Sequence, residues 1–228
     1  MATQKWVGKL GCILSTYNAS SRKSSIIING GGLYFRMVFI MKTQLNIGCG
    51  NNYEEGWMNT EIVRSCKADA YFDAGDQKKD WPFADDTFEE MKACHVFEHL
   101  PDYNARIHFL REAHRVCKKG AKIFLAMPYS SSGGAYNDLQ HIRPFGAASF
   151  DYVSVNPSSK VSILHTQEVG DLVGAFRQKT TIKFGRFFTK FLFLEFFANW
   201  WHTRHIYELL FQYVFMAQEL HVELEVIK

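Results

Sequence analysis

The chain has 228 residues, of which 47% are hydrophobic and 21% are charged, with a formal net charge of +3. This length fits a single domain, and the composition is ordinary for a globular protein. Six of the 26 Lys and Arg residues precede residue 54, where there is no Asp or Glu, so the remainder has 20 basic and 23 acidic residues. The body of the chain therefore lacks the positive field of a nucleic-acid binder.

The five cysteines are scattered, with no two closer than 17 residues, so no Cys-x-x-Cys pair suggests a zinc or redox site. An odd, dispersed set fits a reducing compartment, and we expect a cytoplasmic protein. No apolar run reaches the roughly 20 residues needed to cross a bilayer. The longest candidate, 187–201, is interrupted by Lys190 and Glu195.

Residues 1–40 are rich in Ser and Gly, lack acids and show no sustained periodicity. We interpret them as a basic leader, disordered or non-native, with translation starting at Met41 and the domain covering 41–228. A transit peptide would also be basic, Ser-rich and poor in acids, and a basic arm could contact nucleic acid. A protein that starts at Met41 and still folds and binds its cofactor would favour the first interpretation.

From Met41 onward the pattern predicts strands alternating with helices. The expected strands in this half are Gln44–Gly48, Met58–Ile62, Asp69–Phe72, Phe88–His95 and Ala121–Met127. A helix follows Pro101, with Asp102 as N-cap, Lys118 and Lys119 in its last turn and Gly120 as left-handed cap. Such alternation predicts a parallel sheet with helices on both faces.

The second half of the chain is less regular. We expect a loop over Tyr129–Gly146, a strand near Lys179–Phe184 and a last strand over His221–Lys228, which alternates apolar and acidic residues. That alternation is typical of an antiparallel strand with one solvated face. The fold class is thus a Rossmann-like, mostly parallel twisted α/β sheet with an antiparallel C-terminal strand.

An aromatic-rich segment, 187–215, precedes the last strand. We favour a helical cap over a cleft or part of the core, because apolar stripes are usually packed inside. A dimer face and a membrane-resting patch are the alternatives. The sequence does not determine the oligomeric state.

The sequence from Gln44 to Glu61 carries the main functional signal. A short apolar run ends in Gly48-Cys49-Gly50, as a strand does when its backbone must let a ligand approach closely. Glu61 closes the next strand, where a carboxylate can accept hydrogen bonds from two ribose hydroxyls. Ligands of parallel sheets lie at the carboxyl ends of strands. We therefore expect a nucleoside-containing cofactor.

Four blocks in order resemble class I S-adenosylmethionine-dependent methyltransferases, and most closely the small type 11 group. They are Leu45-Asn-Ile-Gly-Cys-Gly-Asn-Asn, Trp81-Pro-Phe-Ala-Asp-Asp-Thr-Phe-Glu-Glu, His95-Val-Phe-Glu-His-Leu-Pro and Val116-Cys-Lys-Lys-Gly-Ala-Lys. The resemblance covers about Met41 to Pro128. It implies methylation activity with S-adenosyl-L-methionine as cofactor.

The resemblance also implies residue roles. The Gly48-Cys49-Gly50 loop would pack against the methionine part of the cofactor, and Glu61 would hold the ribose. Asp73 and the backbone of Ala74 would face the adenine, and His95 would line the site. Asn46 stands where many members carry an acid; its amide can still bind the amino-acid end of the cofactor, without the charge.

Two other chemistries fit parts of the sequence less well. A dinucleotide site needs a third glycine, but Tyr53 stands there, and Glu61 comes 13 rather than about 20 residues after Gly48. His95-Val-Phe-Glu-His99 matches the inverted zinc-protease pattern His-x-x-Glu-His. Because it follows a strand-like run and precedes Pro101, it is too short for a metal-binding helix, and we expect no metal site.

Methyl transfer itself needs few protein groups, since the protein mainly aligns the acceptor and excludes water. An oxygen or nitrogen acceptor can require a base, and the candidates are Glu98, His99 and His141, of which we select the two histidines as catalytic. The expected acceptor is a small molecule or a sugar rather than a nucleic acid. A methyltransferase-like domain that binds cofactor or a partner without turnover is the alternative.

Overall fold

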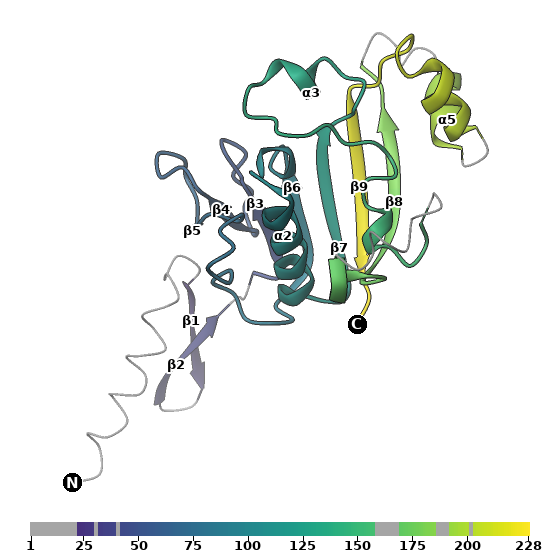
Figure 1. The fold of residues 1–228 in the computed structure, drawn as a ribbon. Helices are drawn as coiled ribbons and strands as arrows, with labels where there is room; N and C mark the ends of the chain where they lie inside the picture. The colour runs from purple at the N-terminus through teal and green to yellow at the C-terminus, as the bar shows by residue number, and fades with distance from the viewer. Residues whose placement is uncertain (1–21, 30–31, 40–41, 158–168, 186–191, 201–202) are drawn as a thin grey trace.

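The computed structural model describes residues 22–29, 32–39, 42–157, 169–185, 192–200 and 203–228 (Figure 1). Its strands are β1 (Arg22–Asn29), β2 (Gly32–Phe39), β3 (Gln44–Ile47), β4 (Met58–Glu61), β5 (Ala70–Tyr71), β6 (Phe88–Cys94), β7 (Cys117–Pro128), β8 (Phe176–Lys183) and β9 (Glu219–Val226). Its α-helices are α2 (Tyr103–Val116), α3 (Gly134–Asn137), α5 (Leu192–Asn199) and α6 (Arg204–Ile206). Single turns are η1 (Phe97–His99), η2 (Asp151–Val153), η3 (Gly170–Leu172) and the π-helical η4 (Tyr207–Phe211).

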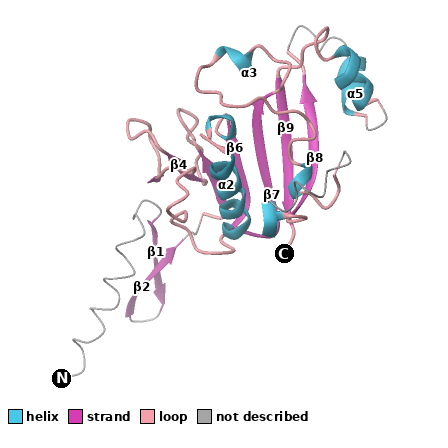
Figure 2. Cartoon of the chain, viewed as in Figure 1, coloured by secondary structure: helices cyan, strands magenta, loops and turns pink. Residues whose placement is uncertain are grey.

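Seven strands form one mixed sheet in the order β5-β4-β3-β6-β7-β9-β8 (Figure 2). The five strands from β5 to β7 pair in parallel, whereas β9 runs antiparallel to both β7 and β8. The predicted fold class is therefore confirmed, including the antiparallel C-terminal strand. Because β3, β4, β5 and β6 are parallel, their carboxyl ends lie at one edge of the sheet, where the sequence predicts the ligand.

The helix α2 begins as predicted, with the Asp102 side chain accepting a hydrogen bond from the Ala105 amide. It ends at Val116, earlier than the Lys118–Gly120 end that we expected. Cys117 is already extended and pairs with Phe88 of β6, and the next pair joins Lys122 to Glu90. Strand pairing thus overrides the local helix-stop signal, and Gly120, at φ +77°, occupies an irregularity within β7 instead of a helix cap.

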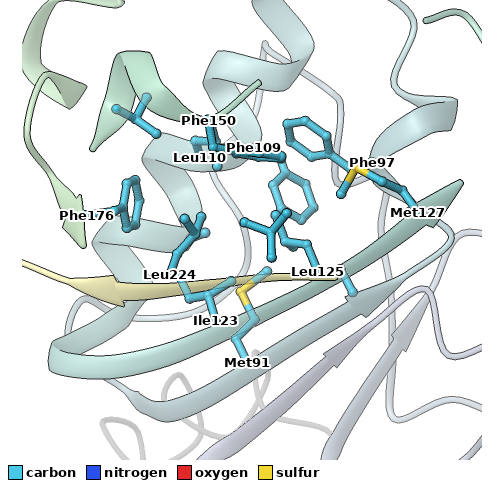
Figure 3. Close-up of a cluster of buried hydrophobic side chains, with 14 of the residues drawn as sticks. Met91, Phe97, Phe109, Leu110, Ile123, Leu125, Met127, Phe150, Phe176 and Leu224 are labelled. Carbon is cyan, nitrogen blue, oxygen red and sulfur yellow. The ribbon is translucent and has the colours of Figure 1, made fainter. Parts of the chain in front are cut away.

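The hydrophobic core lies between α2 and the sheet (Figure 3). Phe109 and Leu110 of α2 are buried against Ile123 and Leu125 of β7 and Met91 of β6 (Figure 3). The chain that links β3 to β4 and β4 to β5 contains turns rather than helices. Among the helices of the described residues, α2 is the longest. The described helices therefore cover less of the two sheet faces than strict alternation of strands and helices predicts.

The aromatic-rich segment packs partly as core. Tyr207 is fully buried, donates a hydrogen bond to the Phe215 carbonyl over 2.8 Å and contacts the ring of Phe184. Phe196 and Trp200, by contrast, are about half exposed, and their rings contact each other in a tilted arrangement with centroids 5.2 Å apart. Residues 186–191 and 201–202 of this segment lie outside the described residues.

Within residues 1–40, for which we expected no regular structure, β1 and β2 pair as an antiparallel hairpin that is separate from the main sheet (Figure 1). Residues 1–21 and 30–31, and residue 40, are outside the described residues. The assignment of this segment as a non-native leader, a transit peptide or a basic arm stays a prediction.

A buried carboxylate ties α2 to the turn that precedes β6. Glu112 is 5% exposed and accepts hydrogen bonds from the Arg115 guanidinium and from the Trp81 amide. Burial opposes its charge, but these hydrogen bonds outweigh that effect and lower the pKa of Glu112. Its ionised form therefore stabilises the fold above the pKa of the unfolded chain, and this stabilisation is lost as the pH falls toward the folded-state pKa.

We expect Glu112→Gln to lower the free energy of unfolding by about 1–3 kcal/mol at pH 7, because a charge-assisted hydrogen bond is replaced by a weaker one. The difference from the unsubstituted protein should shrink as the pH falls below about 4.3, where the unfolded Glu is protonated. Urea unfolding at several pH values measures both effects. Glu55→Gln, at an exposed position, is the control and should change little; a pH-independent loss would contradict the role of the charge.

Candidate active site

A cavity of about 460 Å³ opens at the carboxyl ends of the parallel strands. Six of the eight residues that the sequence assigned to the cofactor line it: Gly48, Gly50, Glu61, Asp73, Ala74 and His95. The volume lies in the range of about 300–1,000 Å³ typical of small-molecule sites. Apolar residues complete the wall, among them Phe72 directly after β5, Val96 two residues after β6 and Leu100 just after η1. Sequence reasoning missed these, although the positions of Phe72 and Val96 close to a strand end were a usable signal.

The glycine loop and Glu61 form one hydrogen-bonded unit. Gly48 and Gly50 both have left-handed backbones, with φ of +64° and +50°. The Gly50 amide donates to one oxygen of Glu61 over 2.7 Å, while the amides of Ile62 and Val63 donate to the other over 2.9 and 3.2 Å. A carboxylate offers about four acceptor positions, so capacity remains on the side that lines the cavity.

The chain after β5 is held in a compact turn beside the cavity. Asp73 accepts a hydrogen bond from the Gly75 amide over 2.8 Å, and the Ala74 carbonyl accepts one from the Trp81 indole over 3.1 Å. Trp81 is 2% exposed, so the turn is anchored in the core. The core thereby fixes the position of Asp73 and Ala74 at the mouth of the cavity.

Two of the residues proposed from the sequence point elsewhere. The buried Asn46 amide donates to the Asn52 carbonyl over 3.2 Å and to the Asn59 side chain over 3.0 Å. Cys49 is 3% exposed, with its thiol 3.5 Å from the Lys67 carbonyl; burial raises its pKa, and the nearby Glu61 charge adds to this. Neither is among the described residues that line the cavity. Both side chains instead contact backbone carbonyls near the glycine loop.

His95 follows β6 directly and adopts φ +55°, which is uncommon for a residue with a side chain. Its Nδ1 lies 3.1 Å from the Glu98 carboxylate, and its Nε2 lies 3.5 Å from that of Glu219. The hydrogen bond with Glu98 raises the pKa of His95, against the effect of partial burial. Strained residues of this kind cluster at functional sites, where the surrounding structure holds them in place.

The three candidate bases converge at the same end of the sheet. His99 lines the cavity, and its ring centroid is 4.7 Å from that of His141. The loop that carries His141 is tied to η1 by a hydrogen bond from the Ile142 amide to the Glu98 carbonyl over 3.3 Å. Gln140, which the sequence did not single out, lines the cavity beside them. The long loop after β7 therefore supplies one wall of the site.

Comparisons with known proteins found a matching family model and similar solved structures. A family model described as a methyltransferase domain matches residues 60–125. A SAM-dependent methyltransferase from Archaeoglobus fulgidus has the same fold: it is 16% identical, the alignment covers 96% of this chain and 91% of that chain, and the TM-score is 0.51. A search of curated proteins found no match.

Two further solved structures are similar at lower scores. A putative methyltransferase from Haloferax volcanii, in complex with the activator Trm112, is 15% identical with a TM-score of 0.46, covering 82% of this chain and 84% of that chain. Phosphoethanolamine N-methyltransferase 2 from Haemonchus contortus, in complex with S-adenosyl-L-methionine, is 13% identical with a TM-score of 0.42, covering 81% and 48%.

Residues 60–125 thus match a methyltransferase domain, and the chain has the fold of a SAM-dependent methyltransferase. Both findings agree with the methyltransferase resemblance that the motifs of the sequence carry. Within the described residues, no helix combines the length and the apolar character required to traverse a bilayer.

Proposed function

We propose that this protein transfers the methyl group of S-adenosyl-L-methionine to an oxygen or nitrogen atom of a small molecule or a sugar. The observation that carries the proposal is the convergence of a glycine loop, two acids and two histidines, His95 and His99, on one cavity, with His141 packed against His99. The bound cofactor supplies an activated methyl group on a sulfonium centre. The residues of the chain bind it, orient the acceptor and exclude water.

For the cofactor, we assign the ribose to Glu61 and the adenine to the turn at Asp73 and Ala74. The left-handed glycines Gly48 and Gly50 let the backbone approach the methionine part closely. His95 borders the same space. Asn46 and Cys49 contribute by holding the loop, because their side chains bond to other parts of the chain.

For the acceptor, we assign activation to His99 with His141. His99 lines the cavity, and His141 packs against it from the loop after β7. No Lys or Arg is among the described residues that line the cavity, which favours a small acceptor over a nucleic acid. A cytoplasmic location stays a prediction.

We expect His99→Ala to lower methyl transfer by at least about tenfold, in the range by which positioned acid–base groups contribute, while leaving cofactor affinity within about twofold. Transfer of label from methyl-labelled cofactor to a panel of hydroxyl and amine acceptors measures turnover, and calorimetric titration measures cofactor binding. His114→Ala is a matched control, since the His114 ring packs against Phe176 and is not among the described residues that line the cavity. Unchanged turnover would remove His99 from the mechanism, and tight cofactor binding without any transfer would favour the non-catalytic alternative.

A further inference from the structure

Three side chains from two distant segments meet beside the cavity. Glu98 and His99 come from η1, and His141 comes from the loop after β7. One ligand atom of each lies within 4.8 Å of the other two. The pairing differs from the His-x-x-Glu-His reading of the sequence, because His141 takes the place of His95 and no metal-binding helix is needed.

The cluster contains polar atoms that are buried without a partner. Glu98 is 2% exposed, and its Oε1 is bonded to His95. Its other oxygen, Oε2, and the Nδ1 of His99 have no hydrogen-bond partner in the described part of the chain. A buried carboxylate oxygen and a buried ring nitrogen are costly when unpaired, and such exceptions often mark the position of an ion or a catalytic group. Both atoms are of the kind that coordinates a cation.

The second histidine is oriented for coordination. The Nδ1 of His141 lies 2.8 Å from the Gly134 carbonyl, which can only accept, so Nδ1 carries the proton. The Nε2 of His141 then keeps its lone pair. Histidine ligands of metals commonly have this arrangement, with the other ring nitrogen donating to a backbone carbonyl. His95 plays the corresponding part for Glu98, through the hydrogen bond to its carboxylate.

We propose that Glu98, His99 and His141 bind a divalent first-row transition metal ion, such as zinc, manganese or cobalt. Two imidazoles and one carboxylate are a donor set for these metals, and three protein ligands leave a coordination position open. His99 and Gln140 border the cofactor cavity, so an ion held by His99 would lie at the cavity wall, within reach of an acceptor. Metal bonds of about 2.0–2.2 Å place tetrahedral ligands roughly 3.4 Å apart, so ligand atoms that lie within 4.8 Å of one another close by at most about 1.4 Å around the ion.

The consequence for the reaction, which depends on the proposed function, is that the acceptor is a hydroxyl compound. Its oxygen occupies the open position, where a divalent cation lowers the pKa of a bound hydroxyl, and its proton passes to water. The oxygen then bonds to the methyl carbon as the carbon–sulfur bond breaks, and the electron pair of that bond stays on sulfur. His99 and His141 act as ligands in this scheme, rather than as proton acceptors.

The test is direct metal binding by the full-length chain. After dialysis against a chelator, the protein is titrated with CoCl2 and with ZnCl2, followed by absorption spectroscopy and calorimetry. We expect one ion per chain and a cobalt spectrum with nitrogen and oxygen ligation. Glu98→Gln and His141→Ala should each weaken binding at least tenfold, whereas His205→Ala, at an exposed position, should leave it unchanged.

Titration of the same variants with S-adenosyl-L-methionine separates this proposal from the proposed function. Cofactor affinity should be retained in all three, which also shows that they are folded. Failure of the unsubstituted protein to bind either metal while it binds cofactor would overturn the metal site. So would a sulfur-to-cobalt charge-transfer band, which marks cysteine ligation, or equal binding by all variants. Metal binding that depends on Glu98 and His141, in a protein that transfers no methyl group, would leave the site standing and reject the proposed function.

Discussion

Glu61→Ala is expected to weaken binding of S-adenosyl-L-methionine by at least about tenfold. Three backbone amides use three of the about four acceptor positions of the carboxylate, so one hydrogen bond from ribose is assigned to it, and a hydrogen bond to a charged group contributes roughly 1.5–3 kcal/mol. The substitution also leaves the amides of Gly50, Ile62 and Val63 without their acceptor, so the glycine loop loses its anchor. Calorimetric titration with the cofactor measures the affinity, and thermal unfolding measures the effect on the fold.

Glu61→Gln separates the charge of this side chain from its shape. The amide retains one acceptor oxygen, and we expect an intermediate loss of affinity with a smaller change in unfolding temperature. Glu55→Ala, an exposed position on the loop between β3 and β4, is the control. Wild-type affinity in Glu61→Gln and Glu61→Ala would exclude the carboxylate from the ribose site and move the cofactor away from this edge of the cavity.

Gly48→Ala is expected to have the largest effect of any single methyl addition at the site. Gly48 has φ of +64°, and a Cβ added there would lie 2.4 Å from Cγ2 of Val96. Left-handed backbone costs a residue with a Cβ roughly 1–2 kcal/mol, and the clash adds overpacking of about 1–3 kcal/mol. We expect the free energy of unfolding to fall by about 2–5 kcal/mol, with cofactor binding lost.

Gly120→Ala is the matched control for Gly48→Ala. Gly120 has a similar φ of +77°, but nothing lies within 4 Å of an added Cβ, and it is remote from the cavity. It should therefore show the backbone cost alone, with unchanged cofactor affinity. The double variant Gly48→Ala/Val96→Ala removes the clash and should recover part of the stability. Equal losses in Gly48→Ala and Gly120→Ala would show that the close packing at Val96 is unimportant.

Local sequence signals placed most strands correctly. The run ending in Gly48 predicted β3, and the runs before Glu61 and His95 predicted β4 and β6 to within a residue. Each is a short stretch whose apolar and β-forming residues are neighbours in the chain, and β3 and β6 are each followed by a residue with positive φ, so neighbouring residues alone carry the signal. The predicted end of α2 was wrong. The sequence Lys118-Lys119-Gly120 fits the C-terminus of a helix as well as an irregular strand, and only the pairing of Cys117 with Phe88 distinguishes the two.

The sequence could not predict which way the side chains of the central strands point. Asn46 lies on a strand whose two faces are both buried, so hydrophobic alternation could not tell which face its amide takes. The structure directs it to Asn59 and the Asn52 carbonyl. Likewise, the sequence placed Glu98 and His99 together only in the rejected zinc-protease pattern with His95, and it identified His141 only as a separate candidate base.

By itself, the sequence determined the fold class and the edge of the sheet at which the cavity opens, because periodicity, glycine position and the order of the motif blocks are properties of neighbouring residues. Only the tertiary structure shows which side chains from distant segments lie close together. Glu98 and His141 are brought together when the loop after β7 bonds back to η1 through Ile142. Such a contact depends on the folding of the whole chain across the sheet, and no local pattern encodes it.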